Sequence, residues 1–170
     1  RRDSILEAIA SLTNQLLTGA YSLGAWIRTA SCPQSREWLT FYKGFQPSAW
    51  NMGDLFSGCY DYGNDNRFFF CAGGSSCLEY ASNLMAGVWY HMVGVYDGTN
   101  ARLYVNGRLQ ASTPHTPAAA GTLGSFWIGA NESDYPGYQF HGDIADVRFY
   151  TSALTADQVR LHHAVGRANI

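Results

Sequence analysis

Charged residues are scarce in this chain of 170 residues. Lysine, arginine, aspartate and glutamate together make up 14% of the sequence, against about 25% in an average soluble domain. The eleven basic and thirteen acidic residues give a formal net charge of −2. This balance excludes the basic surface with which a protein binds nucleic acid or anionic lipid, so we expect no nucleic-acid partner.

Long apolar runs are also missing. The most apolar stretch, Leu84–Tyr96, is interrupted by two glycines and a histidine, whereas a membrane helix needs about 18 consecutive apolar residues. We therefore expect no membrane span. The chain begins at Arg1 and shows no signal-peptide pattern, which favours an excised domain or a processed chain.

Aromatic residues and glycines are abundant, with 9 Phe, 5 Trp, 11 Tyr and 18 Gly. This composition is typical of an all-β domain with many turns. The clearest strand signal runs from Trp89 to Ser112, where apolar residues alternate on either side of two turns, at residues 97–100 and at Asn106-Gly107. Because Asn-Gly is the typical pair of a type I′ hairpin turn, this region predicts a three-stranded antiparallel meander.

Helical signals are confined to the two ends of the chain. In residues 4–17 apolar side chains recur at helical spacing, and near the C-terminus Thr155 and Gln158 form a capping-box pattern, with Leu154 and Val159 as its hydrophobic staple. We expect an N-terminal helical segment over residues 1–20, a sandwich domain over residues 21–165 and a short C-terminal helix.

The four cysteines lack the close C-x2–4-C spacing of a zinc site. Cys71 and Cys77 flank a turn-forming stretch between two apolar runs, so a hairpin there would place them opposite each other. We predict a Cys71–Cys77 disulfide and a second one between Cys32 and Cys59. Four buried free thiols are the alternative.

A single sequon places a candidate glycosylation site at Asn131. Together with the predicted disulfides it favours an extracellular or cell-surface location, because disulfides persist in oxidising compartments.

Four blocks of the sequence, in order, resemble the laminin-G-like domains of the concanavalin A-like lectin/glucanase superfamily. They are Leu23–Arg28, Trp89–Gly107, Leu123–Gly129 and Gly142–Val159. The resemblance implies a jelly-roll sandwich of two curved antiparallel sheets, with a strand at residues 126–129. Where the family usually has its opening strand, this chain has the helical pattern of residues 4–17, so either the first strand is missing or the helix and its surroundings replace it. The strand Ile144–Tyr150 is then expected to lie at a sheet edge.

The same superfamily contains retaining glucanases, whose catalytic carboxylates alternate along one strand and must lie about 5–5.5 Å apart. This chain has only Glu7, Glu37, Glu79 and Glu132, and the only pair with that spacing, Glu132 and Asp134, falls in a predicted loop. The motifs G-x-S-x-G, H-E-x-x-H and the P-loop are absent as well. The sequence therefore predicts a protein that is not an enzyme.

Two groups of residues are candidates for binding. Saccharides bind where aromatic rings stack on the sugar and polar groups contact its hydroxyls, although rings of this kind also fill protein cores. The predicted ligand-binding residues are Trp50, Tyr60, Tyr62, Asn64, Asp65 and Tyr135. Related folds often bind calcium near the closing strand, and calcium prefers oxygen ligands, so Asp134, Asp143 and Asp146 are the candidate ligands of a structural Ca²⁺, with a solvated acidic loop as the alternative.

These observations favour a non-catalytic recognition or structural module of a larger extracellular protein or assembly, binding glycan or protein. The apolar stripe of residues 4–17 is expected to dock within that assembly, because a helix this short is marginal in isolation. A glycan-processing enzyme of the same fold and a purely architectural subunit without ligand are the alternatives.

Overall fold

The computed structural model describes the backbone of residues 19–30, 36–40, 44–45, 52–60, 65–72, 77–81, 84–116, 122–123, 128–129 and 140–170. Side chains are described for residues 19–30, 67–72, 77–80, 84–116, 128–129 and 140–170.

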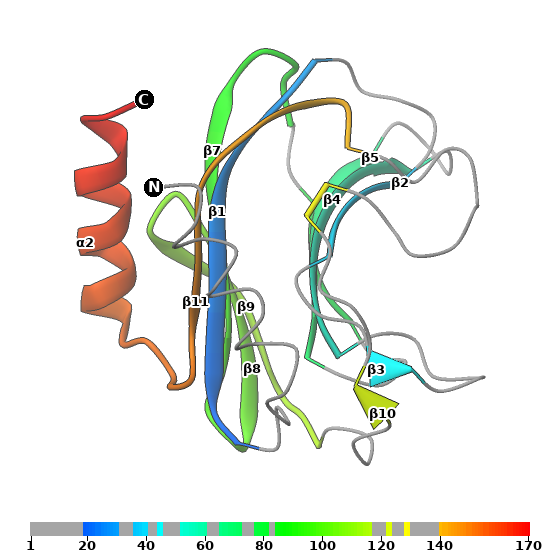
Figure 1. The fold of residues 1–170 in the computed structure, drawn as a ribbon, viewed down its shortest axis with the longest axis vertical. Helices are drawn as coiled ribbons and strands as arrows, with labels where there is room; N and C mark the ends of the chain where they lie inside the picture. The colour runs from blue at the N-terminus through cyan, green and yellow to red at the C-terminus, as the bar shows by residue number, and fades with distance from the viewer. Residues whose placement is uncertain are drawn as a thin grey trace.

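Two antiparallel sheets form the body of the domain (Figure 1). The larger sheet has the order β11-β1-β7-β8-β9, and its strands are β1 (Tyr21–Thr29), β7 (Trp89–Tyr96), β8 (Asn100–Val105), β9 (Arg108–Pro114) and β11 (Gly142–Tyr150). The smaller has the order β2-β4-β5-β6, with β2 (Arg36–Thr40), β4 (Met52–Tyr60), β5 (Asp65–Ala72) and β6 (Cys77–Ala81). A short pair joins β3 (Gly44–Phe45) to β10 (Thr122–Leu123).

The main core lies between these two sheets. Alternate residues of β1, namely Leu23, Ala25 and Ile27, point inward and are almost completely buried together with Phe68 and Phe70 of β5. The predicted all-β antiparallel sandwich is therefore confirmed, and β11 is the outermost strand of the larger sheet within the described part of the chain.

The predicted meander is confirmed, with β7, β8 and β9 paired in sequence order. Its second turn has positive φ angles at Asn106 (50°) and Gly107 (75°), as the Asn-Gly pair predicts. In the first turn the carboxylate of Asp97 accepts hydrogen bonds from the backbone N–H groups of Thr99 (2.9 Å) and Asn100 (2.7 Å). The hydrogen bond from Asn100 is the largest cause, and together with the bond from Thr99 it lowers the pKa of Asp97 to about 2.

The helix α2 (Ala156–Arg167) packs against the outer face of the larger sheet, on the side opposite the smaller sheet (Figure 1). Thr155 and Gln158 form the predicted capping box. The staple residues Leu154 and Val159 are buried in a second cluster that the sheet completes with Val93, Val95 and Tyr104. The larger sheet is thus covered on both faces.

A buried hydroxyl fixes the segment that leads into this helix. The Oγ atom of Ser22, which is fully buried, accepts a hydrogen bond from the backbone N–H of Leu154 (2.8 Å) and donates one to the carbonyl oxygen of Ser152 (2.9 Å). Both bonds satisfy groups that burial would otherwise penalise, so β1 holds the segment that leads into α2.

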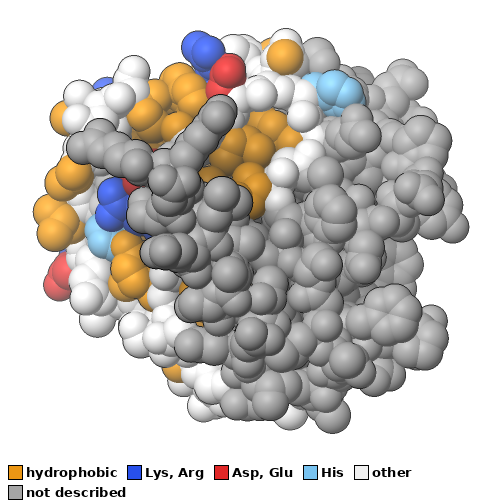
Figure 2. Space-filling view, in the orientation of Figure 1, with side chains coloured by type: hydrophobic (Ala, Val, Ile, Leu, Met, Phe, Trp, Pro, Cys, Tyr) orange, Lys and Arg blue, Asp and Glu red, His pale blue; other side chains and the backbone are white. Residues whose placement is uncertain are grey.

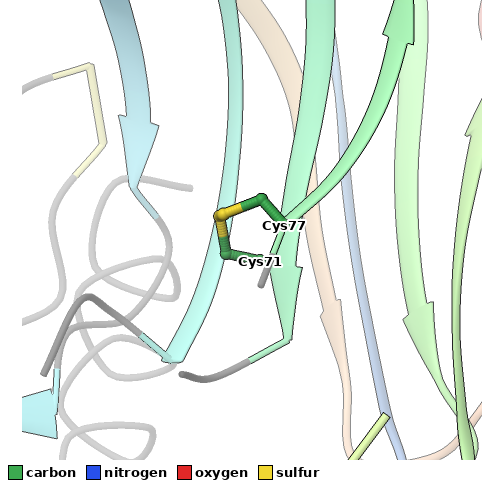
Figure 3. The surroundings of a disulfide bond; sticks show 2 residues. All are labelled: Cys71 and Cys77. Atoms are coloured by element: carbon green, nitrogen blue, oxygen red, sulfur yellow. A yellow bond between two sulfur atoms is a disulfide. The ribbon is translucent and has the colours of Figure 1, made fainter. Parts of the chain in front are cut away.

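The predicted disulfide between Cys71 and Cys77 is confirmed (Figure 3). The two residues pair directly across β5 and β6, with Cα atoms 4.2 Å apart. For the second predicted disulfide, Cys32 lies outside the described residues and only the backbone of Cys59, in β4, is described. That disulfide stays a prediction.

The expected strand at residues 126–129 is wrong for its second half. Ile128 and Gly129 form a bend, and Gly129 has a positive φ of 74°, which is incompatible with an extended strand. The N-terminal helix expected over residues 4–17 lies outside the described residues, and the predicted domain boundaries stay predictions. No helix in the described part of the chain is long and apolar enough to cross a membrane.

Candidate functional site

The predicted ligand-binding residues fall on parts of the chain that the structure does not describe. Trp50, Tyr62, Asn64 and Tyr135 lie outside the described residues, as does the candidate glycosylation site at Asn131. For Tyr60 and Asp65, at facing ends of β4 and β5, only the backbone is described. These assignments stay predictions.

The described members of the predicted calcium site are engaged with arginines. A carboxylate oxygen of Asp143 lies 2.8 Å from Arg28, and one of Asp146 lies 2.8 Å from Arg148. Asp146 also has a positive φ of 50°, beside the point where the register of β1 and β11 shifts. As they stand, these two carboxylates fit ion pairs rather than a shared cation, and the described residues hold no cluster of three possible metal ligands. Since Asp134 lies outside the described residues, the calcium site stays a prediction.

A groove of about 690 Å³ lies at one end of the larger sheet, where the β8–β9 turn approaches His163 of α2. Aromatic, amide and cationic side chains line it together. The lining residues are Trp26, Tyr80, Trp89, Tyr90, Val105, Asn106, Arg108, Gln110, His163, Arg167 and Ile170.

Trp89, the first residue of β7, provides a partly exposed aromatic ring in this groove. The guanidinium of Arg28 lies 5.0 Å from the centre of that ring, a cation–π contact. Arg28 is itself held by its ion pair with Asp143. The ring orientation is therefore supported by two neighbouring strands, since Arg28 belongs to β1 and Asp143 to β11.

Asn106 connects the hairpin turn to the neighbouring strand. Its side-chain Oδ1 accepts a hydrogen bond from the backbone N–H of His91 (2.9 Å), and its own backbone N–H donates to the carbonyl oxygen of His91 (2.8 Å). Asn106 lines the groove, where Gln110 of β9 supplies a second amide.

Trp26 and His163, which line the groove, belong to a cluster of rings between the larger sheet and α2. The indole of Trp26 lies 5.3 Å from the imidazole of His163 and 5.2 Å from that of His91, measured between ring centres. Burial, followed by the nearby His163 and His162, lowers the pKa of His91 to about 4. Burial and then Arg167 lower the pKa of His163. Both shifts favour the neutral form of these two imidazoles.

Chemically, the groove offers ring faces for apolar contact and amide groups for hydrogen bonds. None of its described lining residues is an aspartate or a glutamate, so this part of the lining supplies no carboxylate pair for glycosidic hydrolysis. Such a lining can bind and orient a polar ligand that has apolar faces.

Sequence analysis did not identify this groove. Trp89 and Asn106 stood out as parts of the meander and of the family blocks, not as binding residues, and Tyr80, Arg108 and Gln110 carried no local motif. Trp89 was the one residue in the sequence that could have pointed to the groove. A tryptophan that begins a strand next to a turn can lie at the end of the sheet, where it is accessible to a ligand.

Residues 7–160 match the sequence profile of the family described as the concanavalin A-like lectin/glucanases superfamily. No curated protein matches the chain.

Among solved structures, the fold is similar to a Bacteroides ovatus protein described as carbohydrate-binding, with 20% identity, a TM-score of 0.64, and coverage of 84% of this chain and 40% of that one. It also resembles domain 4 of an extracellular arabinanase from Geobacillus stearothermophilus, solved with arabinotriose, at 22% identity and a TM-score of 0.59, covering 84% and 65%. Trypanosoma rangeli sialidase shares 18% identity with a TM-score of 0.69, covering 88% and 23%. The chain thus spans less than two thirds of each of these proteins.

Proposed function

The chain belongs to the concanavalin A-like lectin/glucanases superfamily, and we propose that it is a non-catalytic module that binds a glycan. The main support is the groove, in which the partly exposed ring of Trp89 lies with the amides of Asn106 and Gln110. Stacking on an aromatic ring combined with amide hydrogen bonds is a common way for proteins to bind saccharides. The similarity to a carbohydrate-binding protein and to a domain solved with arabinotriose agrees with this proposal.

We place the module in an extracellular or cell-surface protein. The Cys71–Cys77 disulfide supports this location, because such bonds are rare in reducing compartments. The arabinanase that contains a similar domain is extracellular. We also propose that the module belongs to a larger protein and that it catalyses no reaction.

The proposal is tested by screening the chain on a glycan array and measuring the affinity for the best glycans by calorimetry. Replacing Trp89 by Ala should weaken binding about tenfold or more, since stacked aromatic residues are frequent hot spots. Gln110→Ala should weaken it less. Leu161→Ala is the matched control, because Leu161 is exposed on α2 and does not line the groove.

Protein binding is the second candidate, and it rests on the outward face of α2. Leu161 is 59% exposed and Val165 is 49% exposed, and Figure 2 shows hydrophobic side chains along the edge of the molecule where α2 lies. If the array detects no glycan while Leu161→Asp abolishes association with another chain, the architectural alternative replaces glycan binding.

A further inference from the structure

Two positive charges line the groove and are not neutralised within the described part of the chain. Arg108 is the first residue of β9, Arg167 is the last residue of α2, and both are exposed. Neither forms an ion pair with a described residue, and no described residue of the lining is acidic.

The other arginines with described side chains behave differently. Each lies within ion-pair distance of a carboxylate: Arg28 with Asp143, Arg67 with Glu79, Arg102 with Asp97, Arg148 with Asp146 and Arg160 with Asp157. In the described part of the chain, therefore, the two arginines without an acidic partner are the two that line the groove.

A structural role accounts for only one of them. Arg167 lies in the last turn of α2, where the helix dipole favours a cation. Its charge also lowers the pKa of His163 in the groove wall, after burial as the larger cause, so the charge acts on the groove. Arg108 follows the Asn106-Gly107 turn, and it pairs with no helix end and no carboxylate among the described residues. Arg108 is therefore the more informative of the two for ligand binding.

We propose that the groove binds an acidic saccharide, with Arg108 and Arg167 contacting the anionic groups that the sugar carries. This inference rests on the proposed function, because it specifies the class of glycan. A planar guanidinium donates paired hydrogen bonds to a carboxylate or sulfate. The aromatic rings and amides of the same groove then contact the uncharged part of the sugar.

The test measures the affinity of the 170-residue chain for three series of oligosaccharides. The first contains uronates, the second is the same series after reduction of the carboxyl groups, and the third carries sulfate groups but no carboxylate. The acidic forms should bind at least about tenfold more tightly than their reduced counterparts, as expected for hydrogen bonds to charged groups. Binding should weaken as sodium chloride rises, because exposed charges are screened. A preference for the sulfated over the carboxylated series would identify sulfate as the anion.

Substitution separates the groove from the rest of the surface. Arg108→Gln and Arg167→Gln should each reduce the affinity for the acidic form about tenfold and leave the affinity for the reduced form unchanged. Arg160→Gln is the control, because Arg160 is an exposed arginine of the same helix that pairs with Asp157 outside the groove. Equal melting temperatures would show that all three variants fold.

Two results would contradict the inference in different ways. If acidic and reduced oligosaccharides bind equally and Arg108→Gln changes neither, the groove binds neutral glycans, and only the proposed function stands. If no oligosaccharide of either kind binds, and the glycan array is blank, the proposed function fails together with the inference.

Discussion

The indole of Trp26 and the imidazole of His163 are stacked, with ring centres 5.3 Å apart and planes inclined by 19°. Trp26 belongs to β1 and His163 to α2, so this contact joins the helix to the outer face of the sheet. Gly166 approaches the same indole one turn further along the helix. The helix is therefore an integral part of the fold and forms one side of the candidate groove.

Replacing Gly166 by Ala should destabilise the protein. A Cβ atom at this position would overlap Nε1 and Cε2 of the indole of Trp26, which is itself buried. Overpacking of this kind costs about 1–3 kcal/mol, and the sign is informative because Gly→Ala inside a helix otherwise stabilises it by up to about 1 kcal/mol. Urea unfolding gives the free energy of unfolding. The exposed neighbour Val165→Ala is the control, and a Gly166→Ala variant more stable than the wild type would contradict the described packing.

Acid should weaken the attachment of α2. His91 has a pKa of about 4 when folded against 6.5 as its ordinary value, so the unfolded chain binds more protons between these two pH values. The contribution of neutral His91 to the free energy of unfolding is therefore complete above pH 6.5. It is lost as the pH is lowered towards 4, which amounts to about 3 kcal/mol for His91 alone. The pKa values of His162 and His163 are also lowered, so both act in the same direction.

Urea unfolding at several pH values measures this effect. The charged groups that shift the pKa of His91 are His163, His162, Asp146 and Arg148. The variant should therefore replace His91 alone and leave these four groups in place. In His91→Asn the slope of the unfolding free energy against pH between 4 and 6.5 should become shallower, whatever the stability of the variant at neutral pH. An unchanged slope would show that His91 is not the group responsible.

Loss of the Cys71–Cys77 disulfide should lower stability modestly. The bond closes a loop with a sequence separation of only 6 residues, and the loss of chain entropy for so short a loop corresponds to about 2 kcal/mol. The double variant Cys71→Ser/Cys77→Ser should show this loss in thermal unfolding, with the fold retained. Mapping of unreduced peptides tests the bond itself and also the predicted Cys32–Cys59 bond. Free thiols at Cys71 and Cys77 in the native protein would contradict the structure.

Calcium should raise the melting temperature if the predicted site forms. At a concentration of about 100 times the dissociation constant, a bound ion adds about 2.7 kcal/mol to the free energy of unfolding. Calcium would have to displace Arg28 from Asp143 and Arg148 from Asp146. The effect should therefore disappear in Asp146→Asn. Identical melting curves in calcium and in chelator would remove calcium from the account.

Local signals in the sequence were sufficient for much of the fold. The positive φ angles of Asn106 and Gly107, the pairing of Cys71 with Cys77 and the cap of α2 each depend on residues a few positions apart. The candidate groove depends on distant ones, since Trp26 and His163 are brought together only by the packing of the helix on the sheet. Trp26 is buried on the outer face of β1 because α2 covers it, and no local pattern predicts that contact.

The central claim is that a glycan binds in the groove, and an NMR titration of the labelled protein with the best glycan from the array tests it most directly. We predict saturable shifts of the Trp89 indole N–H signal and of the side-chain amides of Asn106 and Gln110. The indole signal of Trp26, which is 3% exposed, should move less. Saturable binding that leaves all three groove signals unchanged, or no binding of any glycan, would contradict the account.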